Sequence, residues 1–416
     1  MDLEIVKKTL KGWENGRLEH LRNYYLGNHS IVNRTQADGT KPNNKLMHNF
    51  PSYIVDVFKG YFIGEPVTYR GEDELLGIVQ GIFNYNDEQD INSEIANDMG
   101  VYGKAYEVVY LDEQTKLRFN NIDPRDIRVI YNGDITPEII GAVRRYTVGK
   151  IEYVEVYDSE MVRVYQHKDG VLTLESEQIH VFGIVPVIEY RNNTEEKGDF
   201  EDVISLIDAY NLSRSDKTND LEYFTDAILM LRGMMSTTAE QVSQLKEDRV
   251  LLLDSEGGAD WLIKPSNTAE HDSQIETLRK DIHKFSKTVD LSDEKFAGNA
   301  SGVSLQYKLF IMMQVVANKT RKFKKGLQRR LEIITNYLNF RAGTDRYDWR
   351  SIEIAFDRNE PIDDTAKING ALQLRGLGVS METALSYLPS SIIGDVNREM
   401  EKIDNSTFGL VEEDES

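Results

Sequence analysis

The sequence predicts an α+β protein in which long helices surround one β-rich segment. Three observations carry this prediction. Apolar residues recur at three- and four-residue spacing through much of 200–340, which is typical of long helices. Residues 104–190 instead contain short β-rich runs separated by turn residues. The chain has 416 residues, which is too long for one small core, so we expect two or more folding units.

The N-terminal part is expected to be helical. Residues 2–26 show amphipathic spacing and predict one helix. A polar stretch with Gly and Pro, 31–45, predicts an exposed loop. Pro51 is typical of a first helical turn and opens a helix that ends near Gly60 or Gly64. Two more helices are predicted at 72–84 and 88–101.

The next segment is predicted to be a meandering antiparallel sheet. Residues 104–124 form two β-rich runs around a short polar turn, which indicates a hairpin. Further strands are predicted at 126–132, 141–148, 150–158, 161–167, 171–176 and 184–190.

Two long helices then flank a small insert. The first is predicted from Phe200 to Leu231, with apolar ends that include Leu221 and Phe224. Its middle, 211–220, is polar on nearly every face, which favours a helix that stands in a polar assembly. The insert, 233–268, is expected to hold a short helix near 238–247 and paired strands at 249–254 and 259–265. The second helix is predicted at 269–290.

A glycine-containing loop at 291–303 precedes a third long helix at 304–340, with Ser304 as a candidate N-cap. Gly326 weakens this helix and is a candidate bend. Val303–Leu331 contains eight cations and no acid. Either this is a solvated face neutralised by acidic neighbours in the same or other subunits, or it contacts nucleic acid phosphates. The cations are Lys308, Lys319, Arg321, Lys322, Lys324, Lys325, Arg329 and Arg330.

The C-terminal part is expected to hold a strand at 351–356, helices at 363–375, 380–388 and 391–402, and an acidic tail at 406–416. Residues 368–388 are similar to a helix-turn-helix. The second of these helices offers no Arg or Lys, which recognition helices usually need, so an ordinary helical hairpin is favoured. A DNA-binding regulator that uses these helices remains the alternative function.

Composition excludes several kinds of chemistry. Hydrophobic residues are 40% and the 29 glycines add about 7%, as in ordinary globular chains. Cysteine is absent, which removes disulfides, thiolate catalysis and cysteine zinc sites. No apolar run approaches the roughly 18 residues that span a bilayer, and the charged N-terminus lacks a signal-peptide core. We therefore expect a chain made in the cytoplasm without membrane contact.

The net charge limits how the chain can meet nucleic acid. There are 49 Lys and Arg against 70 Asp and Glu, a net charge of −21. A protein that grips phosphates is normally basic, so tight binding over this whole surface is not expected. DNA that passes nearby without being gripped stays compatible with this charge.

No pattern of an enzyme is present in the sequence. It contains no GxxxxGK[ST] phosphate loop, no GxGxxG and no HExxH, and no two histidines lie closer than nine residues. We therefore expect no catalytic residue, no metal site and no cofactor. A helical and β-rich hydrolase would need a clustered site that the sequence does not offer.

The order of predicted elements resembles the portal proteins of long-tailed bacteriophages, the siphophage head–tail connector type found in phages of Gram-positive hosts. The matching stretches span about residues 45–390. They are NFPSYIVDVFKGYFIGEPVTY, NDMGVYGKAYEVVYLDE with FNNIDPRDIRVIYN, VPVIEYRNN leading to DFEDVISLIDAYNLSRSDKTNDLEYFTDAILMLRG, and DRNEPIDDTAKINGALQLRGLGVS.

The resemblance implies a portal fold with named parts. They are an α/β wing (1–198 and 341–360), a stem (199–232 and 269–290), a small α/β clip (233–268), a tunnel loop (291–303), a long helix that links tunnel to wing and crown (304–340), and a helical crown (361–405).

The resemblance also implies a function. Members form dodecameric rings at one capsid vertex of the virion, through which double-stranded DNA is packaged and ejected without sequence specificity. The implied partners are the terminase motor, a head–tail adaptor, the major capsid protein and the scaffolding protein. No cofactor or enzymatic activity is implied.

Four sets of site residues follow for this chain. Each is an expectation from the resemblance and the residue types together. The tunnel loop would present Asp293, Glu294, Lys295, Phe296, Gly298, Asn299 and Ser301 to the DNA channel. Clip docking would use Trp261, Arg249 and Lys264, although Trp261 could instead fill the small core of the clip. The basic segment is Lys319, Lys322, Lys325 and Arg329, and the subunit interface includes Leu221 and Phe224.

Overall fold

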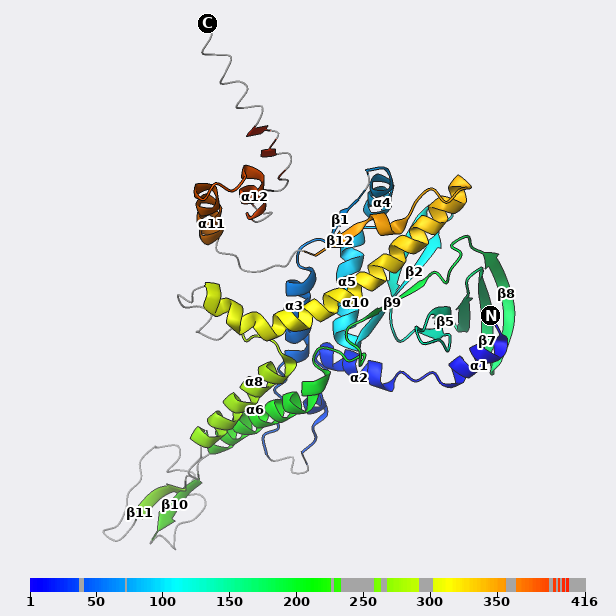
Figure 1. Ribbon diagram of the computed structural model, residues 1–416. Helices are drawn as coiled ribbons and strands as arrows, with labels where there is room; N and C mark the ends of the chain where they lie inside the picture. Colours follow the sequence, from blue (N-terminus) through cyan, green and yellow to red (C-terminus); the bar gives the residue numbers. More distant parts are fainter. Residues whose placement is uncertain are drawn as a thin grey trace. The chain divides into compact units, whose positions relative to one another are not determined.

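The computed structural model describes residues 1–36, 41–71, 73–225, 228–232, 258–262, 268–291, 302–356 and 364–388, with isolated positions up to 403. The chain divides into two compact units (Figure 1). The first comprises Met1–Asp290 and Ile311–Arg358, and the second comprises Leu291–Phe310 and Asn359–Ser416. None of the described helices is long and apolar enough to cross a membrane.

The N-terminal segment forms two helices, α1 (Leu3–Lys11) and α2 (Gly16–Tyr25), so the prediction of one helix over 2–26 is wrong. The physical reason lies in the residues between them. Trp13 Nε1 and Asn15 Nδ2 both donate to the carbonyl oxygen of Arg125, each at 3.0 Å. These two hydrogen bonds fix the residues between α1 and α2 to the β-rich segment.

The helices that follow confirm the prediction. A short 3₁₀ turn, η1 (Ser30–Asn33), precedes α3 (Phe50–Ile63), which has Pro51 in its first turn and Gly64 as its C-cap. The strand β1 (Thr68–Arg70) leads into α4 (Asp73–Tyr85) and α5 (Glu88–Tyr102). α5 ends at Gly103, whose φ of +86° is the left-handed conformation that favours glycine.

The predicted antiparallel meander is confirmed and divides into two sheets. One has the order β3-β2-β9 and the other β4-β5-β6-β7-β8. The helix α1 covers one face of the larger sheet, where Val6 packs against Val143, Val154 and Val156. The strands are β2 (Lys104–Leu111), β3 (Leu117–Ile122), β4 (Ile127–Tyr131), β5 (Ile139–Val148), β6 (Ile151–Tyr157), β7 (Met161–Lys168), β8 (Val171–Ile179) and β9 (Val187–Arg191).

Two long helices run side by side, α6 (Ile204–Thr225, after the 3₁₀ turn η2, Glu201–Val203) and α8 (Thr268–Ser286) (Figure 1). The prediction of one helix to Leu231 is wrong, because Ile228–Arg232 is the strand β10. β10 pairs with β11 (Gly258–Leu262), in antiparallel register. The predicted partner of this second strand, 249–254, and the predicted helix 238–247 lie outside the described residues.

The longest described helix, α10 (Gly302–Ala342), confirms the predicted helix over 304–340, but it begins earlier, so Ser304 lies inside it and is not its N-cap. Within the first unit it buries Val316, Phe323, Leu327 and Ile334 against the wing elements. After the turn η3 (Trp349–Ser351), the strand β12 (Glu353–Ala355) pairs with β1. The second unit contains α11 (Asp364–Gly376) and α12 (Met381–Ser386), and the side chain of Ser380 caps the latter by accepting from the backbone N–H of Thr383.

Candidate functional site: the helix pair α6 and α8, the long helix α10 and the strands β10 and β11

The polar middle of α6 binds another segment of the same chain. Asn211, Ser215 and Asn219 follow each other at four-residue spacing and are all buried. Residues 44–48, here called the strap, lie along them in extended form. The side chains accept hydrogen bonds from three alternate backbone N–H groups of the strap, those of His48 (2.9 Å), Leu46 (2.9 Å) and Asn44 (2.7 Å). The polarity of 211–220 is therefore partly explained within one chain, and it is weaker evidence for an assembly than the sequence suggested.

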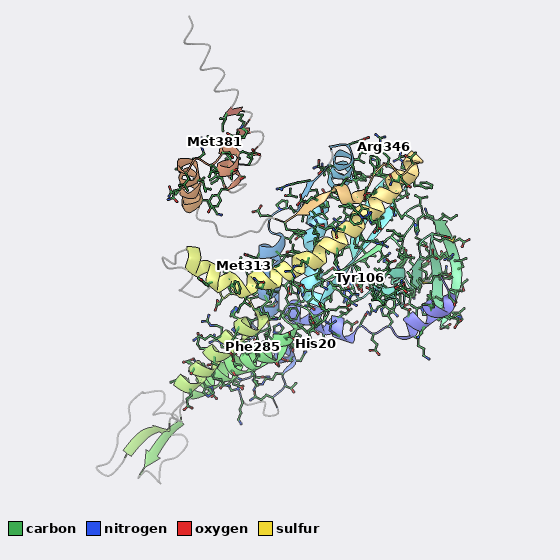
Figure 2. The ribbon with its side chains drawn as sticks, viewed as in Figure 1. His20, Tyr106, Phe285, Met313, Arg346 and Met381 are labelled. Atoms are coloured by element: carbon green, nitrogen blue, oxygen red, sulfur yellow. The ribbon has the colours of Figure 1, made fainter. Side chains whose placement is uncertain are left out.

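Aromatic side chains connect the helix pair α6 and α8 to α3. His283 on α8 lies with its ring edge-on to Phe50 and Tyr53 of α3, at centroid distances of 5.9 and 5.7 Å. Burial lowers the pKa of His283, against the attraction of Asp290. Ile207 and Ile282 are fully buried between the helices, whereas Phe285 on α8 is 52% exposed (Figure 2). The helix pair is thus fixed to α3 at this end, where Phe285 also presents an exposed aromatic side chain.

The basic segment of α10 is not one solvated face. Lys319 is buried and its Nζ lies 2.5 Å from Asp199 Oδ2 and 4.7 Å from the Phe58 ring centroid. Arg329 pairs with Glu332 at 2.9 Å, and Lys324 donates to the carbonyl oxygen of Ile354 at 3.0 Å. For Lys319 the predicted neutralisation by an acid holds within the chain, through Asp199, but the prediction of a solvated position is wrong because the side chain is buried.

Arg330 is the most buried of these cations, with an exposed fraction of 0%. It forms ion pairs with Glu107 of β2 (2.9 Å) and Glu88 of α5 (3.0 Å), and its guanidinium lies over the Phe119 ring. Burial opposes the charge, but Glu107 leads the surrounding groups that raise the pKa of Arg330, so it stays protonated. The sequence prediction missed this cluster. The one signal was Glu107 itself, an acid within the apolar run of β2.

Three cations of the segment remain available to a partner. Arg321 and Lys325 are exposed and Lys322 is half-buried. Across the residues that the structure describes, none of the three has an acidic group within salt-bridge distance. They lie at positions i, i+1 and i+4 of α10 and therefore share one side of the helix.

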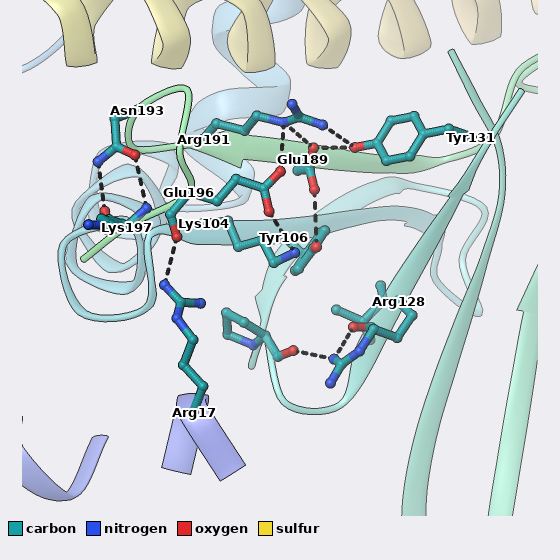
Figure 3. A network of polar contacts seen from close by, with 12 residues as sticks. Arg17, Lys104, Tyr106, Arg128, Tyr131, Glu189, Arg191, Asn193, Glu196 and Lys197 are labelled. Atoms are coloured by element: carbon teal, nitrogen blue, oxygen red, sulfur yellow. Dashed lines mark hydrogen bonds and ion pairs between the residues drawn. The ribbon is translucent and has the colours of Figure 1, made fainter. Parts of the chain in front are cut away.

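A second polar cluster joins the two sheets of the wing (Figure 3). Glu189 of β9 accepts hydrogen bonds from Tyr106 of β2 and from Tyr131 of β4, and pairs with Arg191 at 2.6 Å. Burial, followed by the charge of Glu189, raises the pKa of Tyr131. Glu196 in the following loop pairs with Lys104 at 3.1 Å. Each of these carboxylates is paired with a cation or accepts hydrogen bonds from hydroxyl groups, so the cluster connects the two sheets.

In two clefts of the described residues, the acidic side chains already have partners. One cleft, about 650 Å³, is lined by Tyr69, Phe83 and Glu88 among others. Glu88 is already bonded to Tyr69, Asn92 and Arg330. A second, about 390 Å³, contains Asp199 and Lys319, which neutralise each other. No group of three or more metal-ligating side chains occurs among the residues that the structure describes.

The remaining predicted site residues are placed only in part. Leu221 on α6 is 54% exposed, as an interface residue must be in the single chain. Phe224 belongs to the last turn of α6, and Trp261 lies in β11 opposite Leu229, but their side chains are outside the description. Arg249, Lys264 and the whole tunnel-loop set also lie outside it, namely Asp293, Glu294, Lys295, Phe296, Gly298, Asn299 and Ser301.

Comparisons with known proteins give a family across nearly the whole chain. The family model described as "Phage portal protein, SPP1 Gp6-like" matches residues 10–407. The chain is 24% identical over 413 residues to the portal protein of Bacillus phage SPP1, covering 94% of this chain and 81% of that protein. It is 23% identical over 402 residues to the portal protein of Clostridium phage phiCD119, covering 86% of each.

Solved structures with a similar fold come from the necks of GTA particles. One is the neck of an empty particle with C6 symmetry, and the other is the neck of a native particle with C12 symmetry. Both match with a TM-score of 0.48, at 11% and 12% identity, over 91% of this chain and 95% of theirs.

Proposed function

Because this chain belongs to the SPP1 Gp6-like family of phage portal proteins, we propose that it forms a ring at one capsid vertex of a virion. The channel of this ring would pass double-stranded DNA during packaging and ejection. The single observation that carries the proposal is the family match over residues 10–407. The proposed role is a structural one.

The described elements agree with the parts that a portal needs. A β-rich wing (1–198 and 341–360) would carry a stem (199–232 and 269–290). The end of the stem range, β10, pairs with β11, which lies in the range proposed for the clip (233–268). The long helix (304–340) would link the tunnel loop (291–303) to the wing and the crown (361–405). We propose twelve subunits in the assembled ring.

The net charge supports a channel that does not hold DNA. At −21 per chain, a ring would repel phosphates over most of its surface, so that translocating DNA meets little friction. Cations would then act locally. Lys295 of the tunnel loop would touch phosphate transiently, while Asp293 and Glu294 beside it keep the attraction low.

We propose the clip as the docking surface for the terminase motor and then for the head–tail adaptor. Trp261 is its best anchor, because large aromatic side chains often dominate interfaces. Arg249 and Lys264 would surround it. Major capsid and scaffolding proteins would meet the ring elsewhere.

The mass of the purified chain in solution tests the proposal. A ring gives a mass near twelve times the 47.7 kDa of one chain, by light scattering after size exclusion. A monomer or dimer that binds a specific DNA sequence would instead favour the regulator that uses α11 and α12. That outcome would overturn the portal function.

The tunnel loop has its own test. Gly298→Pro or Phe296→Ala should leave ring assembly intact and impair DNA packaging or retention of packaged DNA, measured as genome content of heads. Normal packaging and stable heads in both variants would reduce the loop to a connector between helices.

A further inference from the structure

One of the three attachments of the strap (residues 44–48) is made by the side-chain amide of Asn211, which also contacts a buried histidine. His29 has an exposed fraction of 0%. Its Nε2 lies 2.9 Å from the carbonyl oxygen of Tyr24. A carbonyl only accepts hydrogen bonds, so Nε2 carries the proton and Nδ1 of the neutral ring carries a lone pair. That lone pair accepts from Asn211 Nδ2 at 3.0 Å.

The other end of the same amide holds the strap. Asn211 Oδ1 accepts from the backbone N–H of His48 at 2.9 Å and lies 3.3 Å from His48 Nδ1. An amide side chain has one accepting end and one donating end. The amide can therefore accept from the strap and donate to His29 at the same time only while His29 is neutral.

We propose that Asn211 couples the protonation of His29 to the attachment of the strap. A second proton on His29 turns Nδ1 into a donor that faces the donor NH₂ of Asn211. If the amide stays, two buried donors oppose each other. If it rotates to offer Oδ1 to His29, its NH₂ faces the N–H of His48, and the strap loses its acceptor. Either way, the attachment at His48 is weakened.

The charged and titratable groups around His29 decide where this happens on the pH scale. They come from α2, the end of η1, the strap and α6. Burial lowers the pKa of His29, against the Tyr24 carbonyl and Asp208, which favour the proton. Burial likewise lowers the pKa of His48, and Arg214 adds to this effect. The Tyr24 ring stacks on His29 and also contacts His20, whereas Tyr210 contacts His48 and Asp216 pairs with Arg34.

The direction of the pH effect follows from these pKa values. The attached form prefers neutral His29, so its pKa lies below the ordinary value of about 6.5. Attachment is therefore at full strength above about pH 6.5 and weakens as the pH falls toward the folded-state pKa. Ser215 and Asn219 do not titrate in this range, so the strap should loosen from its His48 end.

Loss of the hydrogen bond at His48 would also affect the contacts of α3 with α6 and α8. Asn49 and Phe50 follow directly and begin α3. The Phe50 ring packs edge-on against Tyr210 of α6 at 5.1 Å and against His283 of α8. Loosening of His48 thus frees the chain that connects the strap to both helices of the stem.

Hydrogen exchange of the backbone amides in residues 41–49 of the full chain tests the coupling. After correction for intrinsic exchange, protection should fall roughly tenfold between about pH 8 and about pH 5, the ratio expected when one buried hydrogen bond is lost. The strand β2 serves as the internal reference and should keep its protection. Constant protection of 41–49 over this range would overturn the proposal.

Three variants separate this coupling from a general loss of stability. Asn211→Asp places acceptors at both ends, toward protonated His29 and toward the N–H of His48, so it should keep protection at low pH. His29→Phe removes the titrating ring and should make protection independent of pH. His20→Gln, at an exposed histidine whose ring is tilted against Tyr24, should behave as the natural chain does. A wild-type pH response in Asn211→Asp or in His29→Phe contradicts the coupling, as does its loss in His20→Gln.

Discussion

At the scale of single residues, the cations of α10 show that one sequence pattern can hide different roles. Lys319 and Arg330 are buried and paired with carboxylates of the same chain, whereas Arg321, Lys322 and Lys325 remain available. A buried ion pair adds little net stability when intact, but loss of one partner leaves an uncompensated charge. Without Arg330, the buried carboxylates of Glu88 and Glu107 would therefore lose their counter-charge.

We expect Arg330→Met to destabilise the chain by about 3–5 kcal/mol, because it leaves Glu88 and Glu107 buried without their counter-charge. Urea unfolding followed by circular dichroism measures this change. Arg329→Met is the matched control. Arg329 is half-exposed with one partner on the same helix, so its loss should cost less than about 1 kcal/mol. Equal costs at the two positions would show that the buried cluster does not stabilise the wing.

Gly326 in α10 is explained by close packing. A Cβ atom there would lie 2.2 Å from Cε1 of Tyr190, which is itself fully buried. We expect Gly326→Ala to destabilise by about 1–3 kcal/mol, although alanine is the better helix former. Gly77→Ala in α4, where nothing lies within 4 Å of the new methyl group, should be neutral or stabilise by up to about 1 kcal/mol. Thermal unfolding of the two variants compares them, and a stabilised Gly326→Ala would refute the packing argument.

At the scale of elements, the sequence predicts what periodicity controls and misses what tertiary contacts control. The strands of the wing and the long helix α10 follow their apolar spacing. The break between α1 and α2 depends on the Arg125 carbonyl, 110 residues away from Asn15, and no local pattern carries that information. Ile228 and Leu231 fit a helical spacing, but their pairing with β11 makes them a strand. The candidate site divides in the same way. Exposure of Leu221 agrees with the expectation, whereas the buried pairing of Lys319 required the fold.

The outer part of the stem is expected to hold the ring together. Leu221 is half-exposed in the single chain and lies one turn from Phe224 on α6. We expect the double variant Leu221→Asp, Phe224→Asp to lose rings, because burying two charges at a subunit contact costs several kcal/mol. Light scattering would report a fall to the mass of the single chain. Asp220→Asn, an exposed neighbour on the same helix, is the control and should assemble. Intact rings from the double variant would show that this face of the stem is not part of the subunit contact.

At the scale of the whole molecule, each chain carries a net charge of −21, and a ring brings these charges together. Repulsion between like-charged subunits would oppose assembly unless local cations face acids of the neighbour. Arg321, Lys322 and Lys325 are suited to this role, because the described part of their own chain offers them no acid. The rival role is contact with DNA phosphates in the channel. Both roles need the same exposed cations, but they differ in what fails when the cations are removed.

We expect Lys322→Glu with Lys325→Glu to weaken rings, and high salt to weaken rings of the natural chain in the same way, because screening and charge reversal remove the same attraction. The mass distribution in solution measures both effects across a salt series. Lys8→Glu with Lys11→Glu on α1 makes the same change of net charge at two other exposed positions and should leave rings intact. This control separates a local contact from general repulsion. If the α10 variant forms normal rings and only DNA packaging changes, the cations contact phosphate instead. If assembly and packaging are both normal, the three cations contact only solvent, and neither a neighbouring subunit nor DNA.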